Sequence, residues 1–434
     1  MSNSMKGPQG YLPRVVDAQV ERYLKAFGAV EIAGTKWCGK TWTALEHSAS
    51  VSYVDEAVAA AEADPSLMLL GDTPHTIDEW QRVPAIWDAV RHDVDKARGV
   101  RGKYILTGSS TPAINKDQLG PVHSGAGRVG RIRMHPMSLW ESGDSTGEVS
   151  LSGLFEGRFS PCVAPNDSMG LVNVACRGGW PEAIDLDPRD AQMIAREYLQ
   201  ATFDVSFEKL GLDAGLARRV ALSLARNLGQ SVTYKTVASD MFGAEDDPQS
   251  LVSIDTVRRY IDALRGMFIV EEVPGWVPPM RDKKRFASKP KRYFADPSLA
   301  VALLGMGPQA LVEDWQTFGL VLENLVIRDL SVYARSLELL DSAPVRYYRD
   351  DSGLECDAVI ELADGRWAAL EIKASDVKVP DAVKNLKRMR KKLCDNPKAR
   401  TKEPSFMAVV TGVGKFAHEV EPGIYVIPIR VLKP

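Results

Sequence analysis

The feature that most constrains the fold of this chain is one octapeptide, Gly34-Thr35-Lys36-Trp37-Cys38-Gly39-Lys40-Thr41. It follows the apolar run AVEIAG, which is typical of a buried strand, and it precedes KTWTALEHSA, which is typical of a helix. Further short apolar runs follow at 50–55, 75–80 and 104–110, and helical stretches such as 83–96 separate them. Strands alternating with helices in this way predict a mostly parallel sheet in an α/β fold.

The octapeptide matches the pattern GxxxxGK[ST] of a phosphate-binding loop. In such a turn, backbone N–H groups and a helix N-terminus converge on a phosphate group. Lys40 is expected to reach the β- and γ-phosphate oxygens, and the Thr41 hydroxyl is expected to ligate Mg²⁺. The sequence therefore predicts that all eight residues from Gly34 to Thr41 bind ATP. The alternative is a loop with accidental glycines.

An acidic pair follows about 40 residues after the octapeptide, at Asp78 and Glu79. Strand 75–80 carries this pair to its carboxyl end, which is the edge where open α/β sheets bind ligands. We expect Asp78 to hold Mg²⁺ through water and Glu79 to polarise the water that attacks the γ-phosphate. Without the phosphate loop, such a pair would be interpreted as a surface turn.

Two further groups of polar residues are candidates for contact with nucleotide. Thr107 and Ser109 end the strand YILTGSS, where Thr107 is predicted to contact the attacking water and the γ-phosphate. A strand cap is the alternative. Arg128 leaves a glycine-rich loop, and we predict that it is an arginine finger that reaches the nucleotide of a neighbouring subunit. Arg131 and Arg133 are alternatives, as is a surface arginine without this role.

The motifs in this order, GTKWCGKT, IDEWQ, ILTGSS and GRVGRIRMHPMSLWE, resemble those of prokaryotic AAA-type ATPases. The likeness extends over nearly the whole chain and includes RGGWPEA, YFADPSLA and VLENLV. Proteins of this kind carry a C-terminal domain of uncharacterised function that is related to restriction-type nucleases. The resemblance implies an ATPase core, a winged-helix segment and a nuclease-like end.

Residues 216–275 fit a winged helix on their own pattern. SVTYKTVASD begins a short helix, and Ser253 is placed to cap a second helix, IDTVRRYIDALRGMF. The helical spacing predicts that five apolar residues of this second helix face a core: Ile254, Val257, Ile261, Leu264 and Phe268. Arg258 and Arg259 then remain outside as candidate DNA contacts, and FIVEEVPGWV is the candidate wing. A purely structural helical module, or a lid on the ATPase, is the alternative.

Four charged residues form a second candidate site in the C-terminal third. Glu371 and Lys373 are two apart on the strand RWAALEIKA, so both face one side of it. Asp357 lies on the preceding strand of a predicted hairpin, and Glu323 lies in the helix 318–331. Converging carboxylates are ligands for Mg²⁺, and Lys373 would orient water or neutralise phosphate. This resembles the PD-(D/E)XK nuclease pattern, with Cys356 where that pattern has proline.

Composition limits the location and partners of the chain. Its 434 residues carry a net charge of −3, so overall charge does not indicate a nucleic-acid binder. Residues 384–402 are nevertheless dense in Lys and Arg, either as a solvated helix face or as a polyanion-binding patch. The five scattered cysteines and the absence of an 18-residue apolar stretch predict a cytoplasmic protein without a membrane segment.

Together these patterns predict three domains: a P-loop AAA-type ATPase at 1–150, a helical and winged-helix domain at 151–310, and a nuclease-like domain at 311–434. The preferred function is a DNA-binding motor or remodeller of the translocation or branch-migration type. It would use ATP and Mg²⁺ and assemble as a homo-oligomeric ring, with a hexamer the expected number. Two alternatives stay open, an ATP-gated metal-dependent endonuclease and a switch-type ATPase that regulates a protein partner.

Overall fold

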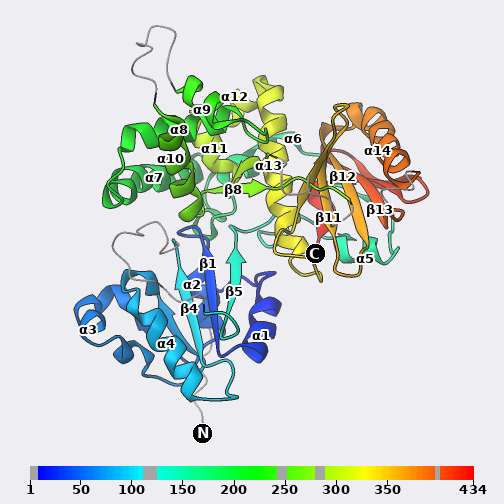
Figure 1. The fold of residues 1–434 in the computed structure, drawn as a ribbon. Coiled ribbons are helices and arrows are strands. Elements are labelled where there is room, and N and C mark those ends of the chain that lie inside the picture. Colours follow the sequence, from blue (N-terminus) through cyan, green and yellow to red (C-terminus); the bar gives the residue numbers. More distant parts are fainter. Residues whose placement is uncertain (1–7, 111–124, 242–251, 279–288, 396–400) are drawn as a thin grey trace. The chain divides into compact units, whose positions relative to one another are not determined.

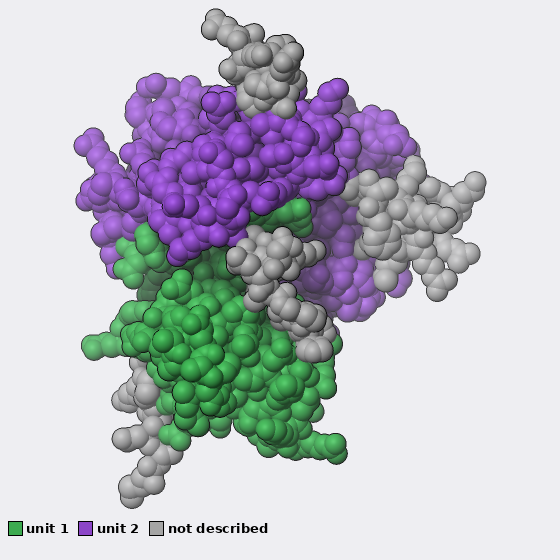
Figure 2. All heavy atoms as spheres, turned by 60° about the vertical axis from the view of Figure 1, so that its left-hand side comes forward, with its two compact units in different colours: residues 1–136, 180–182, 262–269 green, residues 137–179, 183–261, 270–434 purple. Residues whose placement is uncertain are grey.

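The computed structural model of the chain describes residues 8–110, 125–241, 252–278, 289–395 and 401–434. The chain divides into two compact units (Figure 2), which are described one at a time. Unit 1 comprises residues 1–136, 180–182 and 262–269. Unit 2 comprises residues 137–179, 183–261 and 270–434. Across the described ranges, no helix is both long enough and apolar enough to cross a membrane.

A five-stranded sheet forms the centre of unit 1, with the order β2-β3-β4-β1-β5 (Figure 1). Every neighbouring pair of these strands is parallel. The strands are β1 (Ala29–Gly34), β2 (Ser50–Tyr53), β3 (His75–Asp78), β4 (Tyr104–Gly108) and β5 (Val129–Met134). The predicted α/β class with a parallel sheet is confirmed.

Helices cover both faces of this sheet. They are needed on both faces because successive side chains of a strand point to opposite sides, and here both sets are apolar. Along β1, Val30 and Ile32 pack on one face with Ala44. Ala29 packs on the other face in a cluster with Trp87. Because β1 is buried on both sides, its carboxyl end is held firmly at the edge where the phosphate loop begins. The helices of unit 1 are α1 (Asp17–Ala26), α2 (Lys40–Glu46), α3 (Val58–Ala63) and α4 (Ala85–Lys96).

Unit 2 contains a helical part and a sheet. The helical part consists of α6 (Ser168–Arg177), α7 (Pro188–Ala201), α8 (Ala214–Arg226), α9 (Tyr234–Asp240), α10 (Ile254–Gly266), α11 (Pro297–Leu303), α12 (Pro308–Glu313) and α13 (Trp315–Ala334). A π-helix at Thr202–Phe207 continues α7, and α10 ends in the segment 262–269 of unit 1. Strands β8 (Val270–Val273) and β9 (Lys291–Phe294) pair antiparallel after α10.

The second sheet has seven strands in the order β10-β11-β12-β13-β15-β14-β7. Strands β11 and β12 are antiparallel, which confirms the predicted hairpin, whereas β12, β13 and β15 run parallel. The elements are β7 (Cys162–Val163), β10 (Arg346–Arg349), β11 (Glu355–Glu361), β12 (Trp367–Ser375), α14 (Val379–Cys394), β13 (Phe406–Val413), β14 (Phe416–Glu421) and β15 (Ile424–Pro428). Strands β6 (Val149–Ser150) and β16 (Leu432–Lys433) pair beside α5 (Leu151–Phe155).

Candidate nucleotide site and carboxylate cluster

The predicted phosphate loop turns sharply between β1 and α2. Gly39 caps α2 with φ 98°, a left-handed conformation that glycine adopts without strain. A Cβ at Gly34 would lie 2.3 Å from the carbonyl oxygen of Met134, so this position also excludes a side chain. Lys36 and Trp37 are exposed, whereas Thr35, Cys38 and Lys40 are buried. The loop therefore presents backbone, not side chains, around the start of α2.

Lys40 is held inside this loop. Its side chain is only 4% exposed, and its Nζ donates a hydrogen bond of 2.7 Å to the carbonyl oxygen of Thr35. The buried Oγ1 of Thr35 has no hydrogen-bond partner among the described residues. A buried ammonium and an unsatisfied hydroxyl in a curled loop suit an anionic ligand, because a buried polar group without a partner costs free energy.

Arg14 braces the loop from outside and was missed by the sequence analysis. Its two terminal nitrogens donate 2.8 Å hydrogen bonds to the carbonyl oxygens of Cys38 and His135. The guanidinium thus ties the phosphate loop to the chain just after β5. No local pattern marks Arg14, since its acceptors lie 24 and 121 residues away in the sequence.

The acidic half of the site lies on neighbouring strands at the same sheet edge. The Thr41 hydroxyl donates a 2.8 Å hydrogen bond to Oδ1 of Asp78, and the Thr107 hydroxyl donates to the same oxygen. Thr107 also accepts a 3.1 Å hydrogen bond from the backbone N–H of Glu79. Thr41, Asp78 and Thr107 therefore form one connected group across α2, β3 and β4.

Glu79 has an unusual backbone conformation. Its φ of 55° is left-handed, which is uncommon for a residue with a side chain and is found at functional sites. Its Oε2 accepts hydrogen bonds from the Ser109 hydroxyl at 3.1 Å and from the Gln81 amide. The carboxylate is thus oriented by hydrogen bonds from Ser109 and Gln81.

These residues fit Mg²⁺ and a triphosphate. The Thr41 hydroxyl and the Asp78 carboxylate provide adjacent oxygen donors, which Mg²⁺ prefers. The loop provides backbone N–H groups, the start of α2 and the Lys40 ammonium for phosphate. All the predicted ATP-site residues from Gly34 to Thr41, together with Asp78, Glu79 and Thr107, lie at one end of the unit 1 sheet.

Arg128 lies at the other end of that sheet. Strands β1 and β5 run parallel in register, with Ala29 beside Val129 and Gly34 beside Met134. Arg128 precedes β5, so the length of a strand, about 20 Å, separates it from the phosphate loop of its own chain. It is partly exposed, and its Nε lies 2.6 Å from Oδ1 of Asp95. Any contact with nucleotide must therefore be made to another copy of the chain.

The other two arginines of this motif have partners within unit 1. Arg131 forms an ion pair of 3.1 Å with Glu31. The guanidinium of Arg133 lies 3.8 Å from the ring centroid of Phe268 and donates a hydrogen bond to its carbonyl oxygen. Each of the three arginines thus has a partner within its own subunit, so these contacts do not distinguish among them.

Unit 2 brings the four predicted C-terminal residues into one cluster. Lys373 Nζ lies 2.7 Å from Glu371 and 3.4 Å from Asp357, and the Ile372 N–H donates to Asp357 at 2.8 Å. Glu323 enters from α13 and accepts a 2.6 Å hydrogen bond from the Tyr293 hydroxyl. The cluster therefore combines a helix carboxylate with the two carboxylates of the β11–β12 hairpin.

Two members of this cluster, Lys291 and Asn385, were not predicted, because they come from other elements. Lys291 of β9 lies 2.7 Å from Glu355, 3.4 Å from Glu323 and 3.9 Å from Asp357. Asn385 of α14 donates hydrogen bonds to Glu371 at 2.5 Å and to the carbonyl oxygen of Glu355 at 2.7 Å. The carboxylates are thus neutralised by two ammonium groups.

Burial and crowding shift the pKa values in this cluster. Burial, reinforced by the charge of Asp357, raises the pKa of Glu323 to about 7. The same two causes raise the pKa of Glu371. Burial opposes the charge of Lys373, but Asp357 and Glu371 outweigh it and hold the pKa of that ammonium above its ordinary value. Among the described residues, no group of three or more Asp, Glu, His or Cys has the arrangement of a metal site.

The predicted winged-helix segment forms three helices, α8, α9 and α10, followed by the β8–β9 hairpin. Ser253 caps α10 as predicted, accepting a 3.1 Å hydrogen bond from the Thr256 N–H. The prediction that Ile254 and Phe268 face a core was wrong. Ile254 is 48% exposed because it lies in the first turn of α10. Phe268 lies after the end of the helix and is half-buried. Arg258 and Arg259 are exposed.

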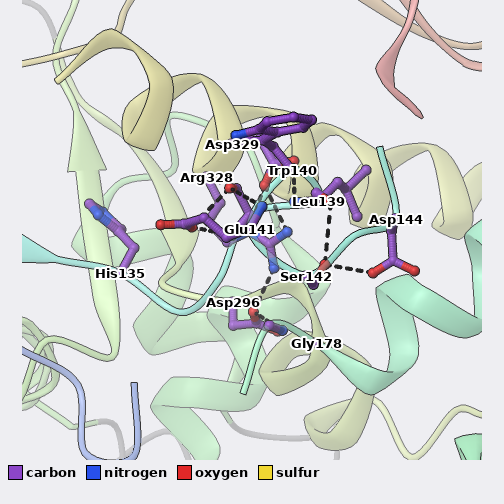
Figure 3. A network of polar contacts seen from close by, with 12 residues as sticks. His135, Leu139, Trp140, Glu141, Ser142, Asp144, Gly178, Asp296, Arg328 and Asp329 are labelled. Atoms are coloured by element: carbon purple, nitrogen blue, oxygen red, sulfur yellow. Dashed lines mark hydrogen bonds and ion pairs between the residues drawn. The ribbon is translucent and has the colours of Figure 1, made fainter. Parts of the chain in front are cut away.

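Unit 2 also holds a buried ionic network that unites several motifs of unexplained role (Figure 3). Arg328 of α13 lies 2.8 Å from Asp296 and 2.7 Å from Asp329. The Leu139 N–H donates to Asp329 at 3.0 Å, and the Gly179 N–H donates to Asp296 at 2.9 Å. The network thus joins MSLWE, RGGWPEA, YFADPSLA and the helix α13 that contains VLENLV.

Three family models match successive parts of this chain. Residues 27–142 match an AAA domain. Residues 170–310 and 318–432 match two domains of unknown function, DUF8612 and DUF4143. The AAA match includes the phosphate loop, the acidic pair and Thr107.

Comparison with whole proteins gives distant likenesses. The chain is 27% identical over 367 residues to the uncharacterized proteins Rv2008c of Mycobacterium tuberculosis and Mb2031c of Mycobacterium bovis, covering 82% of this chain and 72% of each relative. Among solved structures, the Walker-type ATPase PABY2304 of Pyrococcus abyssi has a TM-score of 0.44 at 10% identity, covering 69% of this chain and 97% of that one. The Thermotoga maritima RuvB Holliday junction branch migration motor has a TM-score of 0.26 at 15% identity, covering 62% and 93%.

TM-scores this low do not establish a shared function. The family match and the geometry of the phosphate loop are the stronger findings, because they concern the same residues. Lys40 and Thr41 lie at the start of a helix after a buried strand, and Asp78 lies 2.8 Å from the Thr41 hydroxyl. The chain therefore contains an AAA-type P-loop ATPase domain and is an ATP-hydrolysing enzyme.

Proposed function

We propose that this enzyme is an ATP-driven motor or remodeller of DNA that works in the cytoplasm as a homo-oligomeric ring, with a hexamer the expected number. The division into an ATPase at 1–150, a winged-helix domain at 151–310 and a nuclease-like domain at 311–434 belongs to the same proposal. The observation that carries it is the combination of a phosphate loop with an exposed arginine pair on α10.

In the ATPase step, each residue has a separate task. Lys40 binds the β- and γ-phosphate oxygens, and the loop backbone fixes the orientation of the triphosphate. Thr41 and Asp78 would hold Mg²⁺, which when bound would neutralise charge on the phosphates. Glu79, held by Ser109, orients water and accepts its hydrogen bond, and Thr107 fixes Asp78 relative to the Glu79 backbone.

The ring is supported by the position of Arg128. Its place at the sheet edge opposite the phosphate loop suits contact with the nucleotide of a neighbouring copy. An arginine supplied in this way stabilises charge that develops in the transition state and accelerates hydrolysis by orders of magnitude. Leaving Asp95 costs little, because exposed ion pairs contribute about 0–1 kcal/mol.

DNA binding is supported by α10 and the hairpin after it. Arg258 lies 3.5 Å from Asp255 and its guanidinium is 5.4 Å from the Tyr234 ring. Arg259, its exposed neighbour, forms no ion pair with any residue in the described ranges. A helix that follows two others and precedes a hairpin is the element that winged-helix proteins insert into the major groove.

The test compares ATPase rates without DNA and with duplex, single-stranded and branched DNA at a stated low salt concentration, beside a Lys40→Ala control. Stimulation by DNA is expected, and duplex affinity should fall in Arg258→Gln/Arg259→Gln. Arg259→Gln alone is compared with Arg265→Gln as a matched control, since each removes one charge from the same helix and Arg265 lies 3.0 Å from Asp262. Wild-type protein that neither binds DNA nor responds to it would refute the proposal.

A metal-dependent endonuclease is the second candidate, favoured by the meeting of Asp357, Glu371 and Lys373 in one buried cluster. The two carboxylates would hold the metal and Lys373 would neutralise the scissile phosphate. Lys373 now spans both carboxylates, so a divalent cation has to displace it. DNA cleavage with Mn²⁺ that disappears in Asp357→Ala and Lys373→Ala supports this candidate, and unchanged cleavage in both variants removes it.

A further inference from the structure

The basic run in the C-terminal third forms the outer face of α14. The inner face of this helix is buried in the core of the second sheet through Ala382, Val383, Leu386, Met389 and Leu393. The outer face carries six exposed cations, Lys384, Lys387, Arg388, Arg390, Lys391 and Lys392. Because the helix is fixed on its inner face, the Cα atoms of these residues keep constant positions relative to one another.

Three of the six cations are neutralised by acids of neighbouring elements. Lys387 lies 2.8 Å from Glu421 of β14. Arg390 lies 2.5 Å from Glu403, and Lys392 lies 2.5 Å from Asp350. These three cations are half of the basic face. Their role is explained by ordinary ion pairs at the protein surface.

Lys384, Arg388 and Lys391 differ from the other three. No ion pair or hydrogen bond links their side chains to any other residue in the described part of the chain. Their spacing of four and then three residues places them in one row along the helix. At a rise of 1.5 Å per residue, this row is about 10 Å long. The unpaired charge of α14 is thus concentrated in a single stripe.

The helix that carries the stripe also contacts the carboxylate cluster. Asn385, the neighbour of Lys384, donates hydrogen bonds to Glu371 and to the Glu355 carbonyl oxygen. At about 100° per residue, the stripe lies about 60–120° around the helix from Asn385.

The chemistry of the stripe indicates its partner. Unpaired cations in a row on a well-packed helix suit the regularly spaced phosphates of a nucleic acid. A helix that lies on a membrane needs an apolar face toward the lipid, whereas the apolar face of α14 is inside the core. Nucleic acid is therefore favoured over an anionic lipid surface.

We propose that Lys384, Arg388 and Lys391 bind the phosphate backbone of duplex DNA, as a second DNA-binding site separate from α10. This site rests on the proposed function, since it gives the C-terminal part of the enzyme its own contact with the same substrate. It accounts for a basic patch in a chain whose net charge is −3.

Two triple variants of the full chain test the site. Lys384→Gln/Arg388→Gln/Lys391→Gln removes the stripe, and Lys387→Gln/Arg390→Gln/Lys392→Gln removes the same charge from the same helix at the paired positions. Duplex binding is measured by fluorescence anisotropy between 50 and 200 mM salt. Each phosphate contact adds about 0.9 to the slope of log affinity against log salt, so the stripe variant should lose about 2–3 in slope. Urea-unfolding transitions followed by tryptophan fluorescence, unaltered from wild type in both variants, verify that they fold.

The outcomes separate the two proposals. A slope that falls in the stripe variant and stays near wild type in the paired variant supports the site. Equal loss in both variants assigns the effect to general charge and overturns the site, as does an unchanged slope in the stripe variant. Loss of binding to phosphatidylserine vesicles, with duplex binding intact, also overturns it. Absence of DNA binding by wild-type enzyme instead refutes the proposed function.

Discussion

The hydroxyl of Thr41 lies 2.8 Å from Oδ1 of Asp78, although the two residues are 37 positions apart in the sequence. Thr41 begins α2 and Asp78 ends β3, so the parallel sheet brings the phosphate loop and the acidic pair to one edge. Because the contacts of this site are known atom by atom, the predictions for ATP hydrolysis can be made for individual side chains.

Lys40→Ala should abolish ATP hydrolysis, with a fall in turnover of about a hundredfold or more. The buried ammonium is the only cationic side chain in the octapeptide that points inward, since Lys36 is exposed. Steady-state phosphate release measures the effect. Lys25→Ala, at the exposed end of α1, removes the same charge and serves as the control. Turnover at the wild-type rate in Lys40→Ala would contradict the assignment.

Glu79→Gln should retain ATP binding and lose hydrolysis by a similar factor. The amide keeps the size of the side chain but is a weak acceptor for the proton of an attacking water. Calorimetry of ATP binding and single-turnover hydrolysis separate the two effects. If binding and hydrolysis fall together, Glu79 has a structural role in the loop rather than a catalytic one.

Arg328→Met should destabilise unit 2 by about 3–5 kcal/mol, because it leaves two buried carboxylates without their cation. Asp296 and Asp329 are both fully buried. Urea unfolding followed by tryptophan fluorescence measures the change. Arg158→Met breaks an exposed pair with Glu156 in the same unit, and a change of at most about 1 kcal/mol is expected there. Similar effects in both variants would show that the network contributes no more than a surface pair.

Asp329 should also make stability depend on pH. Burial raises its pKa from 3.8 to about 6. Between about pH 4 and pH 6, the folded chain therefore keeps a proton at this site that the unfolded chain has lost. The contribution of the site to stability is greatest below pH 4 and falls as the pH rises through 6.

Asp329→Asn removes this titration. The stability of wild type relative to the variant should therefore be greater at pH 4 than at pH 7, as measured by urea unfolding at both values. A difference that stays constant, or that grows as the pH rises, would show that the pKa of Asp329 is not raised.

Local sequence patterns predicted those features that depend on residues close together in the sequence. The octapeptide predicted its own strand–turn–helix setting, and the strand ends predicted which polar residues meet at one edge of unit 1. The β11–β12 hairpin likewise followed from two short strands separated by a turn at Ala363, Asp364 and Gly365. The periodicity of α10 correctly predicted that its centre is buried, but it wrongly predicted that Ile254 is buried. A helical period does not show how far the neighbouring element extends along the helix.

The sequence by itself determined an α/β ATPase core and the residues of its phosphate loop, because each feature is encoded within a few adjacent residues. Only the tertiary structure decided which distant charges meet. It placed Arg14 on the Cys38 carbonyl and Lys291 among Glu323, Glu355 and Asp357. Partners of a charged side chain depend on how separate elements pack, and this packing leaves no periodic signal in the chain.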